Sequence, residues 1–428
     1  MTQKIIIKDY SSTYGELVTF NTNNNRSHHR WYPLVEGFSF EFVRAIIGEQ
    51  EKLPKTCLDP FGGVGTTALT CQELGIKCHT IESNPFFYEV SRTKLRNDYA
   101  SPVILKFIET LVLASNRKPL AVNLPNLESE TFFESNNRSK WLLDSEVAYA
   151  IQEIINLIDL NFQNEVKYSK LFKVGLSNLL VPMSNVFRNG KCLSYRKGWK
   201  ENSFSRKDVF NRFIEYCRNV ILIDIRTSMQ ENRITNFLNV EFGDARDKIK
   251  EIEDNSLDLV ITSPPYLNSR DYTDIYRLEL WMLGYVTNFE QEKVIRKSAL
   301  TSHVQVELKD YELLDNRKLA SFVSHLNNLN GSLWNKNIPN MIKGYFSDMH
   351  ELLLEINKKL RTGGKVYLNV SNSAYGNEIC YVDEILFEIA ESLGFLGIEI
   401  REARKINSSR QQKLPEKLRE SVIVLKKV

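Results

Sequence analysis

The spacing of apolar residues along the chain predicts an α/β domain. Short runs of aliphatic and β-branched residues, bounded by glycine, proline or acidic residues, predict seven strands. The runs are 56–58, 78–82, 237–242, 257–261, 365–370, 395–403 and 421–425. Stretches with helical spacing lie between several of them, including 346–360 and 382–393. Strands that alternate with helices favour a sheet covered by helices on both faces.

Two segments interrupt this alternation and divide the chain. Long amphipathic stretches without strand patterning run from 101 to 235 and predict a mainly helical insertion. Residues 286–345 are polar and rich in Asn, Asp and Lys, which predicts a second insertion with long loops. The α/β domain is therefore expected to consist of residues 1–100 and 236–428.

Composition and charge narrow the class of protein only modestly. The 428 residues are 42% hydrophobic and 25% charged, as in an ordinary globular protein. A net charge of +3 means that any affinity for phosphate must come from local basic patches. The six cysteines form no C-x-x-C pair and no Cys/His cluster at zinc-ligand spacing, so we expect a reducing, cytoplasmic compartment and no metal site. The N-terminus does not resemble a signal peptide, and no apolar stretch is long enough to span a bilayer.

Glycine and acidic residues that could bind a ligand follow three of the predicted strands. Asp59-Pro60-Phe61-Gly62-Gly63-Val64-Gly65-Thr66 follows the first strand as a glycine-rich turn. An acid before the glycines repels a pyrophosphate but can pair with a ligand ammonium group, although a purely structural turn has similar sequence features. Glu82 ends the second strand, where an acid typically accepts hydrogen bonds from ribose hydroxyls. Asp244 and Ala245 follow the third strand and are candidates for an adenine ring.

A fourth strand breaks abruptly into Ser263-Pro264-Pro265-Tyr266. The two prolines fix the backbone and bring no N–H donors, so the carbonyl groups of this loop can act as acceptors. A hydroxyl and an aromatic ring beside them suit a flat molecule with an exocyclic amine. These features indicate a nucleobase.

The glycine turn and the Ser-Pro-Pro-Tyr loop together resemble the S-adenosylmethionine-dependent amino-methyltransferases that act on DNA. The resemblance covers about residues 28–95, 237–283 and the C-terminal strands, and it leaves both insertions outside. It implies a Rossmann-like methyltransferase sheet, mostly parallel, of seven strands with the last antiparallel. A serine in the first position of the loop is most typical of cytosine-N4 enzymes, whereas Asp or Asn is usual in adenine-N6 enzymes.

The resemblance also implies a cofactor and a set of site residues. The cofactor is S-adenosyl-L-methionine, and the catalytic residues are Ser263, Pro264, Pro265 and Tyr266. Ser263 and the Pro264 carbonyl would orient the amine of a flipped cytosine, and Tyr266 would stack on the base. The expected cofactor-binding residues are Tyr32, Pro33, Asp59, Pro60, Phe61, Gly62, Gly63, Gly65, Thr66, Glu82, Asp244, Ala245 and Ser263.

A basic stretch from 188 to 200 mixes cations, glycines and aromatic residues, which favours a phosphate-contacting loop, although a solvated connector has the same composition. Polar residues just after the catalytic loop, the segment 407–412 and the second insertion are further candidates for base recognition. The expected DNA contacts are Arg188, Lys191, Arg196, Lys197, Lys200, Arg270 and Tyr272. Double-stranded DNA is the expected partner, and a restriction or host-defence system with a cognate endonuclease is the expected context.

Three other functions fit the pattern less well. Adenine-N6 methylation is the first alternative, because the serine is a preference and not a rule. A non-catalytic nucleic-acid-binding protein on the same fold is the second, and a nicotinamide oxidoreductase is the third. Methylation of cytosine C5 is excluded. Enzymes of that kind need a nucleophilic cysteine, normally after a proline, and none of the six cysteines follows a proline.

Overall fold

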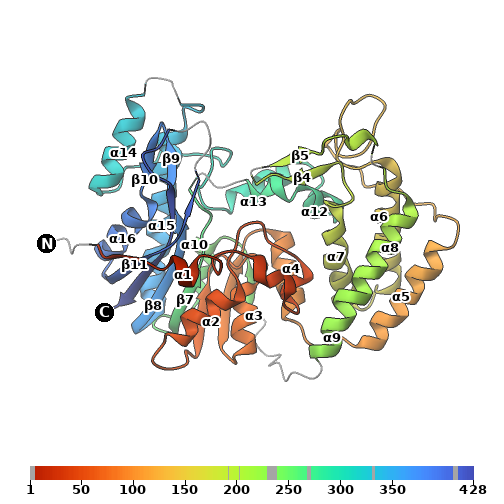
Figure 1. Ribbon diagram of the computed structural model, residues 1–428, viewed down its shortest axis with the longest axis horizontal. Coiled ribbons are helices and arrows are strands. Elements are labelled where there is room, and N and C mark those ends of the chain that lie inside the picture. Colours follow the sequence, from red (N-terminus) through yellow and green to blue (C-terminus); the bar gives the residue numbers. More distant parts are fainter. Residues whose placement is uncertain are drawn as a thin grey trace.

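The computed structural model describes residues 5–190, 192–201, 203–228, 239–267, 271–329, 333–407 and 413–428. These residues build one large sheet with the strand order β1-β11-β12-β8-β7-β2-β3-β6 (Figure 1). Its strands are β1 (Ile7–Asp9), β2 (Thr56–Asp59), β3 (Lys77–Glu82), β6 (Val240–Phe242), β7 (Leu257–Thr262), β8 (Leu360–Ser371), β11 (Phe395–Ile406) and β12 (Leu418–Lys427). β12 is antiparallel to both neighbours, and every other pair is parallel. The predicted Rossmann-like methyltransferase sheet with an antiparallel last strand is confirmed.

The strand count differs from the prediction by one. The additional strand, β1, pairs in parallel with the sheet edge, with Ile7 opposite Ile400. Its three residues are all exposed, so the alternation that marks a half-buried strand is missing from the sequence. The predicted strand 237–242 is described from residue 239 onward, and its first two positions lie outside the described residues.

Helices cover both faces of the sheet because successive strand residues point to opposite sides. In β7, Leu259 and Ile261 pack on one side, while Val260 packs on the other. The first face carries α1 (Ser11–Tyr14), α2 (Phe40–Gly48), α3 (Thr66–Glu73) and α4 (Pro85–Leu95); the second carries α10 (Ala245–Lys248), α15 (Ile338–Lys359) and α16 (Val382–Ser392).

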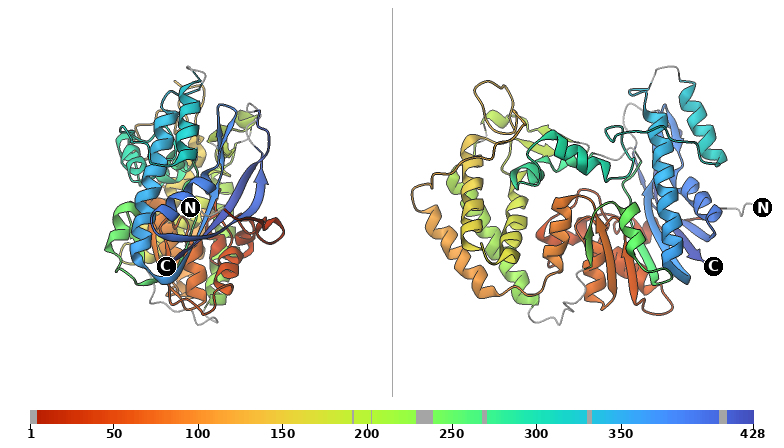
Figure 2. Two further views of the ribbon diagram at one scale, coloured as in Figure 1. Left: turned by 90° about the vertical axis from the view of Figure 1, so that its left-hand side faces the viewer. Right: turned by 180° about the vertical axis from the view of Figure 1, so that it is seen from behind.

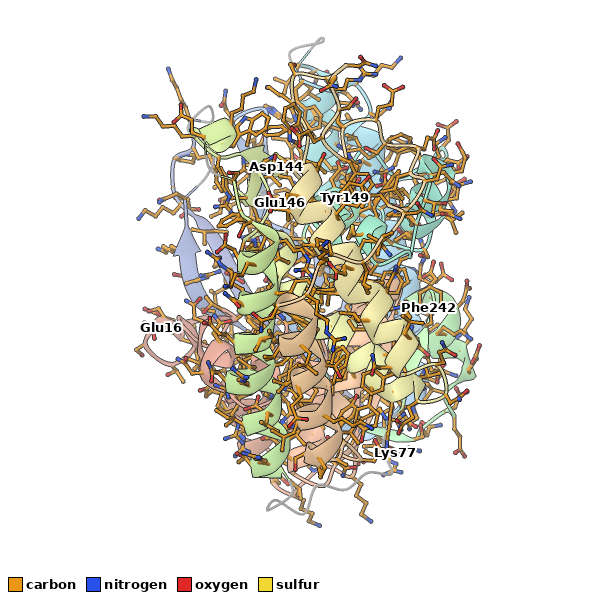
Figure 3. All side chains as sticks on the ribbon, turned by 90° about the vertical axis from the view of Figure 1, so that its right-hand side faces the viewer. Glu16, Lys77, Asp144, Glu146, Tyr149 and Phe242 are labelled. Atoms are coloured by element: carbon orange, nitrogen blue, oxygen red, sulfur yellow. The ribbon has the colours of Figure 1, made fainter. Side chains whose placement is uncertain are left out.

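The segment after α4 forms a helical bundle beside the sheet, on the right of Figure 1 and on the left of the reverse view in Figure 2. It contains α5 (Ser101–Ser115), α6 (Ser145–Asn161), α7 (Val166–Leu180), α8 (Arg206–Tyr216), the π-helix η4 (Cys217–Leu222) and α9 (Ile223–Ser228). Figure 3 looks onto its outer face, where α6 displays Glu146 and the exposed Tyr149. No helix among the described residues is long and apolar enough to cross a membrane.

A buried aspartate joins the bundle to the N-terminal segment. The Asp224 carboxylate, on α9 and 2% exposed, accepts hydrogen bonds from the backbone N–H of His28, the Arg30 guanidinium and the indole of Trp31. Three donors on one carboxylate offset the cost of burying its charge. This joint fixes the bundle against the residues that lead into the sheet.

The connections in the predicted second insertion, residues 286–345, contain helices where only long loops were predicted. They contain α13 (Phe289–Lys297) and α14 (Arg317–Asn327), and residue 345 falls inside α15. The remaining elements are the hairpins β4 (Val186–Arg188) with β5 (Leu193–Tyr195) and β9 (Ser373–Tyr375) with β10 (Glu378–Cys380), α11 (Tyr272–Ile275), α12 (Arg277–Met282), and the 3-10 turns η1 (Asn21–Asn25), η2 (His29–Trp31), η3 (Trp199–Glu201) and η5 (Ile249–Glu251).

Candidate active site

The glycine turn after β2 is held in a left-handed conformation that favours glycine. Gly63 has φ of 52° and Gly65 has φ of 85°, and Gly65 caps the start of α3. The Ser91 hydroxyl donates to the Gly63 carbonyl at 2.8 Å. A Cβ on Gly63 would lie 3.2 Å from Leu34 Cδ2, so glycine keeps the floor of the adjoining pocket open.

Gly62 provides a direct test of how tightly this turn packs. A Cβ at this position would lie 2.1 Å from Cγ2 of Thr80 on β3. We expect Gly62→Ala to lower the free energy of unfolding by about 1–3 kcal/mol, because both residues lie in a packed layer. Chemical denaturation would measure this, and the added change Thr80→Ser should restore part of the loss by removing the clashing methyl group. Equal losses with and without Thr80→Ser would contradict the packing argument.

Asp59 and Glu82 end neighbouring parallel strands, and both carboxylates accept hydrogen bonds from backbone N–H groups of the glycine turn. Asp59, 2% exposed, accepts from the Thr262 hydroxyl at 2.7 Å and from the backbone N–H of Phe61 at 3.1 Å. Glu82 accepts from the backbone N–H groups of Gly63 and Asn84, each at 2.7 Å. The Thr262–Asp59 bond ties the end of β7 to the end of β2, which brings the Ser-Pro-Pro-Tyr loop and the glycine turn together.

Burial changes the acidity of both groups. It raises the pKa of Asp59 to about 6 and the pKa of Glu82 to about 7, although hydrogen bonds from neighbouring donors oppose the shift. Both carboxyl groups therefore titrate close to neutral pH.

Two adjoining pockets lie at the carboxyl ends of the strands. The larger has a volume of about 900 Å³, partly open to solvent, and the smaller about 440 Å³. They share Leu34, Glu36, Phe61, Gly63, Ser263 and Tyr272. Ser263 thus lies on the wall between them and can contact a molecule in either pocket.

Most of the predicted site residues line these pockets. Pro60, Glu82, Asp244, Ala245 and Pro265 line the larger one, and Asp59, Gly62, Thr66, Pro264 and Tyr266 line the smaller one. The structure therefore brings together the ends of four strands that lie far apart in the sequence.

Three predicted cofactor residues lie elsewhere. Among the described residues, neither pocket wall includes Tyr32, Pro33 or Gly65. Tyr32 is 1% exposed, and its hydroxyl donates to the buried Glu279 carboxylate at 2.9 Å, so this ring belongs to the core. Leu34 and Glu36, a few residues further on, line both pockets instead.

The sequence did not reveal one wall of the larger pocket. Residues around the end of α13 close this side, among them Arg296, Leu300 and His303. Arg296 forms an ion pair of 2.6 Å with Asp271, which lies a few residues after the Ser-Pro-Pro-Tyr loop. Asp244 is likewise paired, because Arg246 binds its carboxylate and also reaches Asp348 at 2.7 Å.

The predicted DNA contacts differ in where the structure places them. Arg188 turns inward to pair with Glu279, which is fully buried, and Arg196 donates to the Ser184 and Val181 carbonyls. This geometry does not support a phosphate contact by either arginine. Lys197 and Lys200 are exposed beside the β4–β5 hairpin. Tyr272 lines both pockets, and Lys191, Arg270 and the segment 408–412 lie outside the described residues.

Three cysteine thiols lie close together between α3 and the sheet, which the spacing of the cysteines in the sequence did not indicate. Cys57 and Cys78 are paired neighbours on β2 and β3, and Cys71 lies on α3, which covers this face. Their sulfur atoms all lie within 4.8 Å of one another, and the three side chains are buried. They fill the contact between helix and sheet as small apolar side chains. That the chain holds no metal stays a prediction.

The known proteins that are similar in sequence to this chain carry the same description, type II methyltransferase. The chain is 28% identical to the type II methyltransferase M.BsoBI of Geobacillus stearothermophilus, over 95% of this chain and 86% of the relative. It is 27% identical to the type II methyltransferase M.AvaI of Nostoc sp. PCC 7120, over 94% and 86%. M.MvaI of Kocuria varians matches at 23% over 58% of this chain and 55% of the relative.

Other comparisons add little. No family profile matches the chain. A solved structure of a proposed DNA modification methylase from Thermus thermophilus overlaps 43% of this chain and 50% of its own, with a TM-score of 0.23 and 13% identity. An overlap this poor supports no conclusion about function. The matches over nearly its whole length show that the homologues of this chain are type II DNA methyltransferases.

Proposed function

We propose that this protein is a DNA methyltransferase that transfers a methyl group from S-adenosyl-L-methionine to the exocyclic N4 of a cytosine flipped from double-stranded DNA. The observation that carries the proposal is the position of Ser263 on the wall shared by two pockets at the ends of β2, β3, β6 and β7. Ligands of open α/β sheets bind at this edge. The type II relatives support a role in restriction and modification, with a cognate endonuclease as partner.

The residues present fit this cofactor. A sulfonium and an ammonium group both carry positive charge, and the pockets are lined by the acidic residues Glu36, Asp59 and Glu82. Asp59 and the glycine turn would hold the amino-acid part, and Glu82 the ribose. Ala245 and Leu300 would contact the adenine ring. When bound, S-adenosylmethionine supplies an electrophilic methyl group.

The catalytic loop would act by orientation. The exocyclic amine of cytosine is conjugated to its ring, so its lone pair is a poor nucleophile. Acceptors at Ser263 and at the Pro264 carbonyl would hold the two amine hydrogens and turn the lone pair toward the methyl group. The prolines favour this role because their rings restrict the loop and leave its carbonyls without competing N–H donors. The gain comes from positioning and electrostatics, without a covalent intermediate.

The pKa of Glu82 leads to a pH-dependence with a defined sign. If the carboxylate binds the ribose hydroxyls, affinity for S-adenosylmethionine should fall about tenfold between pH 8 and pH 6, as a group with a pKa of about 7 becomes protonated. Protein stability without cofactor should change in the opposite direction: the folded state has the higher pKa, so it gains stability as pH falls below 7. Calorimetric titration at several pH values tests this. A pH-independent affinity would contradict the assignment of Glu82, and Glu82→Gln should lose most of the dependence and keep only the smaller part that comes from Asp59, whose pKa is about 6.

Exposed cations beside the β4–β5 hairpin are the proposed DNA contacts. Lys197 and Lys200 flank Trp199. The Trp199 ring packs against the rings of Trp141 and Tyr195, with centroid distances of 5.0 Å and 5.3 Å. Aromatic rings near cations suit contact with a DNA backbone or an unstacked base.

Each lysine should contribute to the salt dependence of DNA binding. We expect Lys197→Ala or Lys200→Ala to reduce the slope of log K against log salt by about 0.9 if each contacts one phosphate. Fluorescence anisotropy with a duplex at several salt concentrations measures this slope. Lys52→Ala, an exposed lysine before β2, is the matched control and should leave the slope unchanged. A slope unaffected by both hairpin lysines would contradict this interface.

Binding and transfer assays test the proposed function. The purified protein should bind S-adenosylmethionine in preference to NAD and transfer a labelled methyl group from it to plasmid DNA. Binding without transfer would favour a non-catalytic nucleic-acid-binding protein. Binding of NAD alone would favour an oxidoreductase, and both outcomes would contradict the proposal.

A further inference from the structure

Asp348 lies on the buried face of α15, and its carboxylate joins two walls of the larger pocket. One oxygen accepts from the Arg246 guanidinium at 2.7 Å, and the other accepts from the backbone N–H of Thr301 at 2.8 Å. Asp348 is 5% exposed and lies behind the pocket walls. Arg246 lies on α10, whereas Thr301 follows α13 in the second insertion. Asp348 therefore connects two segments that are far apart in the sequence.

The first of these walls is the turn that follows β6, residues 243–245. Asp244 accepts from the backbone N–H of Arg246 at 2.9 Å, and the Arg246 side chain binds the same carboxylate, with its Nε 3.0 Å from one oxygen. Asp244 and Ala245 both line the larger pocket. The guanidinium thus lies between two carboxylates, and Asp348 is the one that comes from outside the turn.

The second wall is the segment 298–303, which follows α13. The residues of this segment that line the larger pocket are Ser298, Ala299, Leu300, Ser302 and His303. Thr301, between them, is 1% exposed and gives its backbone N–H to Asp348. The pocket-lining residues of this segment are therefore fixed to α15 at its centre.

Gly344 allows this segment to approach α15 closely. It lies one helical turn before Asp348, on the same face of the helix. A Cβ on Gly344 would lie 2.6 Å from the Tyr311 ring and 2.7 Å from Thr301 Cγ2. The Tyr311 hydroxyl and the Thr301 hydroxyl also share a hydrogen bond of 2.9 Å. Any larger residue at position 344 would push Thr301 away from Asp348.

A flat ligand ring needs two walls at a fixed spacing. Adenine carries no charge, so its affinity depends on close contact with apolar side chains and on a few well-placed polar groups. Ala245 on one wall and Leu300 on the other are suited to this contact. A single carboxylate that bonds to both walls fixes their separation before the ligand arrives.

We propose that Asp348 is a positioning residue that sets the width of the adenine subsite by holding the turn after β6 and the segment 298–303 together. The inference rests on the proposed function. It assigns this part of the second insertion to the cofactor pocket and not to recognition of the DNA sequence.

Calorimetric binding of two ligands tests this. We expect Asp348→Ala to raise Kd at least about tenfold, the factor for one lost hydrogen bond to a charged group. The rise should be equal for S-adenosylhomocysteine and 5′-methylthioadenosine, because both carry the adenine ring, and kcat at saturating S-adenosylmethionine should stay within about threefold of wild type. Asp348→Asn keeps an acceptor oxygen for the Thr301 N–H and should recover part of the affinity. Asp59→Asn should weaken only S-adenosylhomocysteine, because 5′-methylthioadenosine lacks the amino-acid group.

Asp383→Ala provides the matched control. Asp383 is a buried helix aspartate on α16 that accepts from Arg419 at 2.8 Å and from the backbone N–H of Glu384 at 2.9 Å, and it lines neither pocket. Its loss should lower the free energy of unfolding and leave both Kd values unchanged.

Gly344→Ala moves the same wall without removing a charge, so it should also raise both Kd values and gives the test if Asp348→Ala does not fold. Wild-type Kd values for folded Asp348 and Gly344 variants, or an equal rise for Asp383→Ala, would overturn the inference while the proposed function stands. A wild-type protein that binds neither S-adenosylmethionine nor S-adenosylhomocysteine would overturn both.

Discussion

Replacing Ser263 by alanine is expected to lower kcat for methyl transfer about 100- to 1,000-fold, the range for removing one preorganised hydrogen-bonding group from a transition state. Alanine keeps the loop backbone and both prolines, and it removes only the acceptor for the amine hydrogen. The affinity for S-adenosylmethionine should remain within about twofold, because Asp59 and Glu82 are still in place.

Single-turnover kinetics and calorimetric binding on the same preparation separate the two effects. Ser256→Ala is a suitable control, since Ser256 precedes the opposite end of β7 and its hydroxyl donates to the Glu253 carbonyl. Equal losses of turnover and cofactor affinity in Ser263→Ala would mean that this serine supports the fold of the loop and not the reaction.

Replacing Arg188 by alanine should lower the free energy of unfolding, and it should not change DNA binding by the folded fraction of the protein. Arg188 and Glu279 are 16% and 0% exposed in their side chains, and removing one partner of a buried ion pair costs about 3–5 kcal/mol because the other charge is left unpaired. Arg188 also donates to the Tyr32 hydroxyl at 3.0 Å and lies over the Tyr276 ring. The expected loss therefore spreads over the contact between the hairpin, α12 and the N-terminal segment.

Thermal and urea denaturation measure this loss, and the salt slope of DNA binding separates it from a phosphate contact. The slope of Arg188→Ala should match wild type, in contrast to Lys197→Ala. A stable Arg188→Ala protein with a reduced slope would restore the interpretation of Arg188 as a DNA contact.

The contrast between Arg188 and the strand ends shows which features can be predicted from sequence. Local patterns mark the ends of β2, β3 and β7, because strand alternation stops there and glycine, proline or an acid follows. Parallel strands align these ends at one edge, so Asp59, Glu82 and Ser263 could be placed in one site without coordinates. Arg188 lies in a locally basic stretch, and its partner Glu279 is 91 residues away. Nothing near Arg188 in the sequence indicates that it is buried.

The same limit applies to the residues that complete the site. Thr262 meets Asp59 only because β7 lies beside β2, and Glu420 meets the Tyr266 hydroxyl only because β12 lies close to the end of β7. The wall formed by Arg296 to His303 comes from a polar segment whose composition is typical of a solvated loop. Long-range pairing decides these positions, and a local pattern cannot report it.

Identification of the methylated nucleoside tests the central proposal most directly. Plasmid DNA is incubated with the purified protein and S-adenosylmethionine, digested to nucleosides and analysed by mass spectrometry beside DNA treated with Ser263→Ala. The proposal predicts N4-methylcytosine with the wild-type protein and a strongly reduced amount with the variant. N6-methyladenine would reassign the target base, and DNA without any added methyl group would contradict the proposed function.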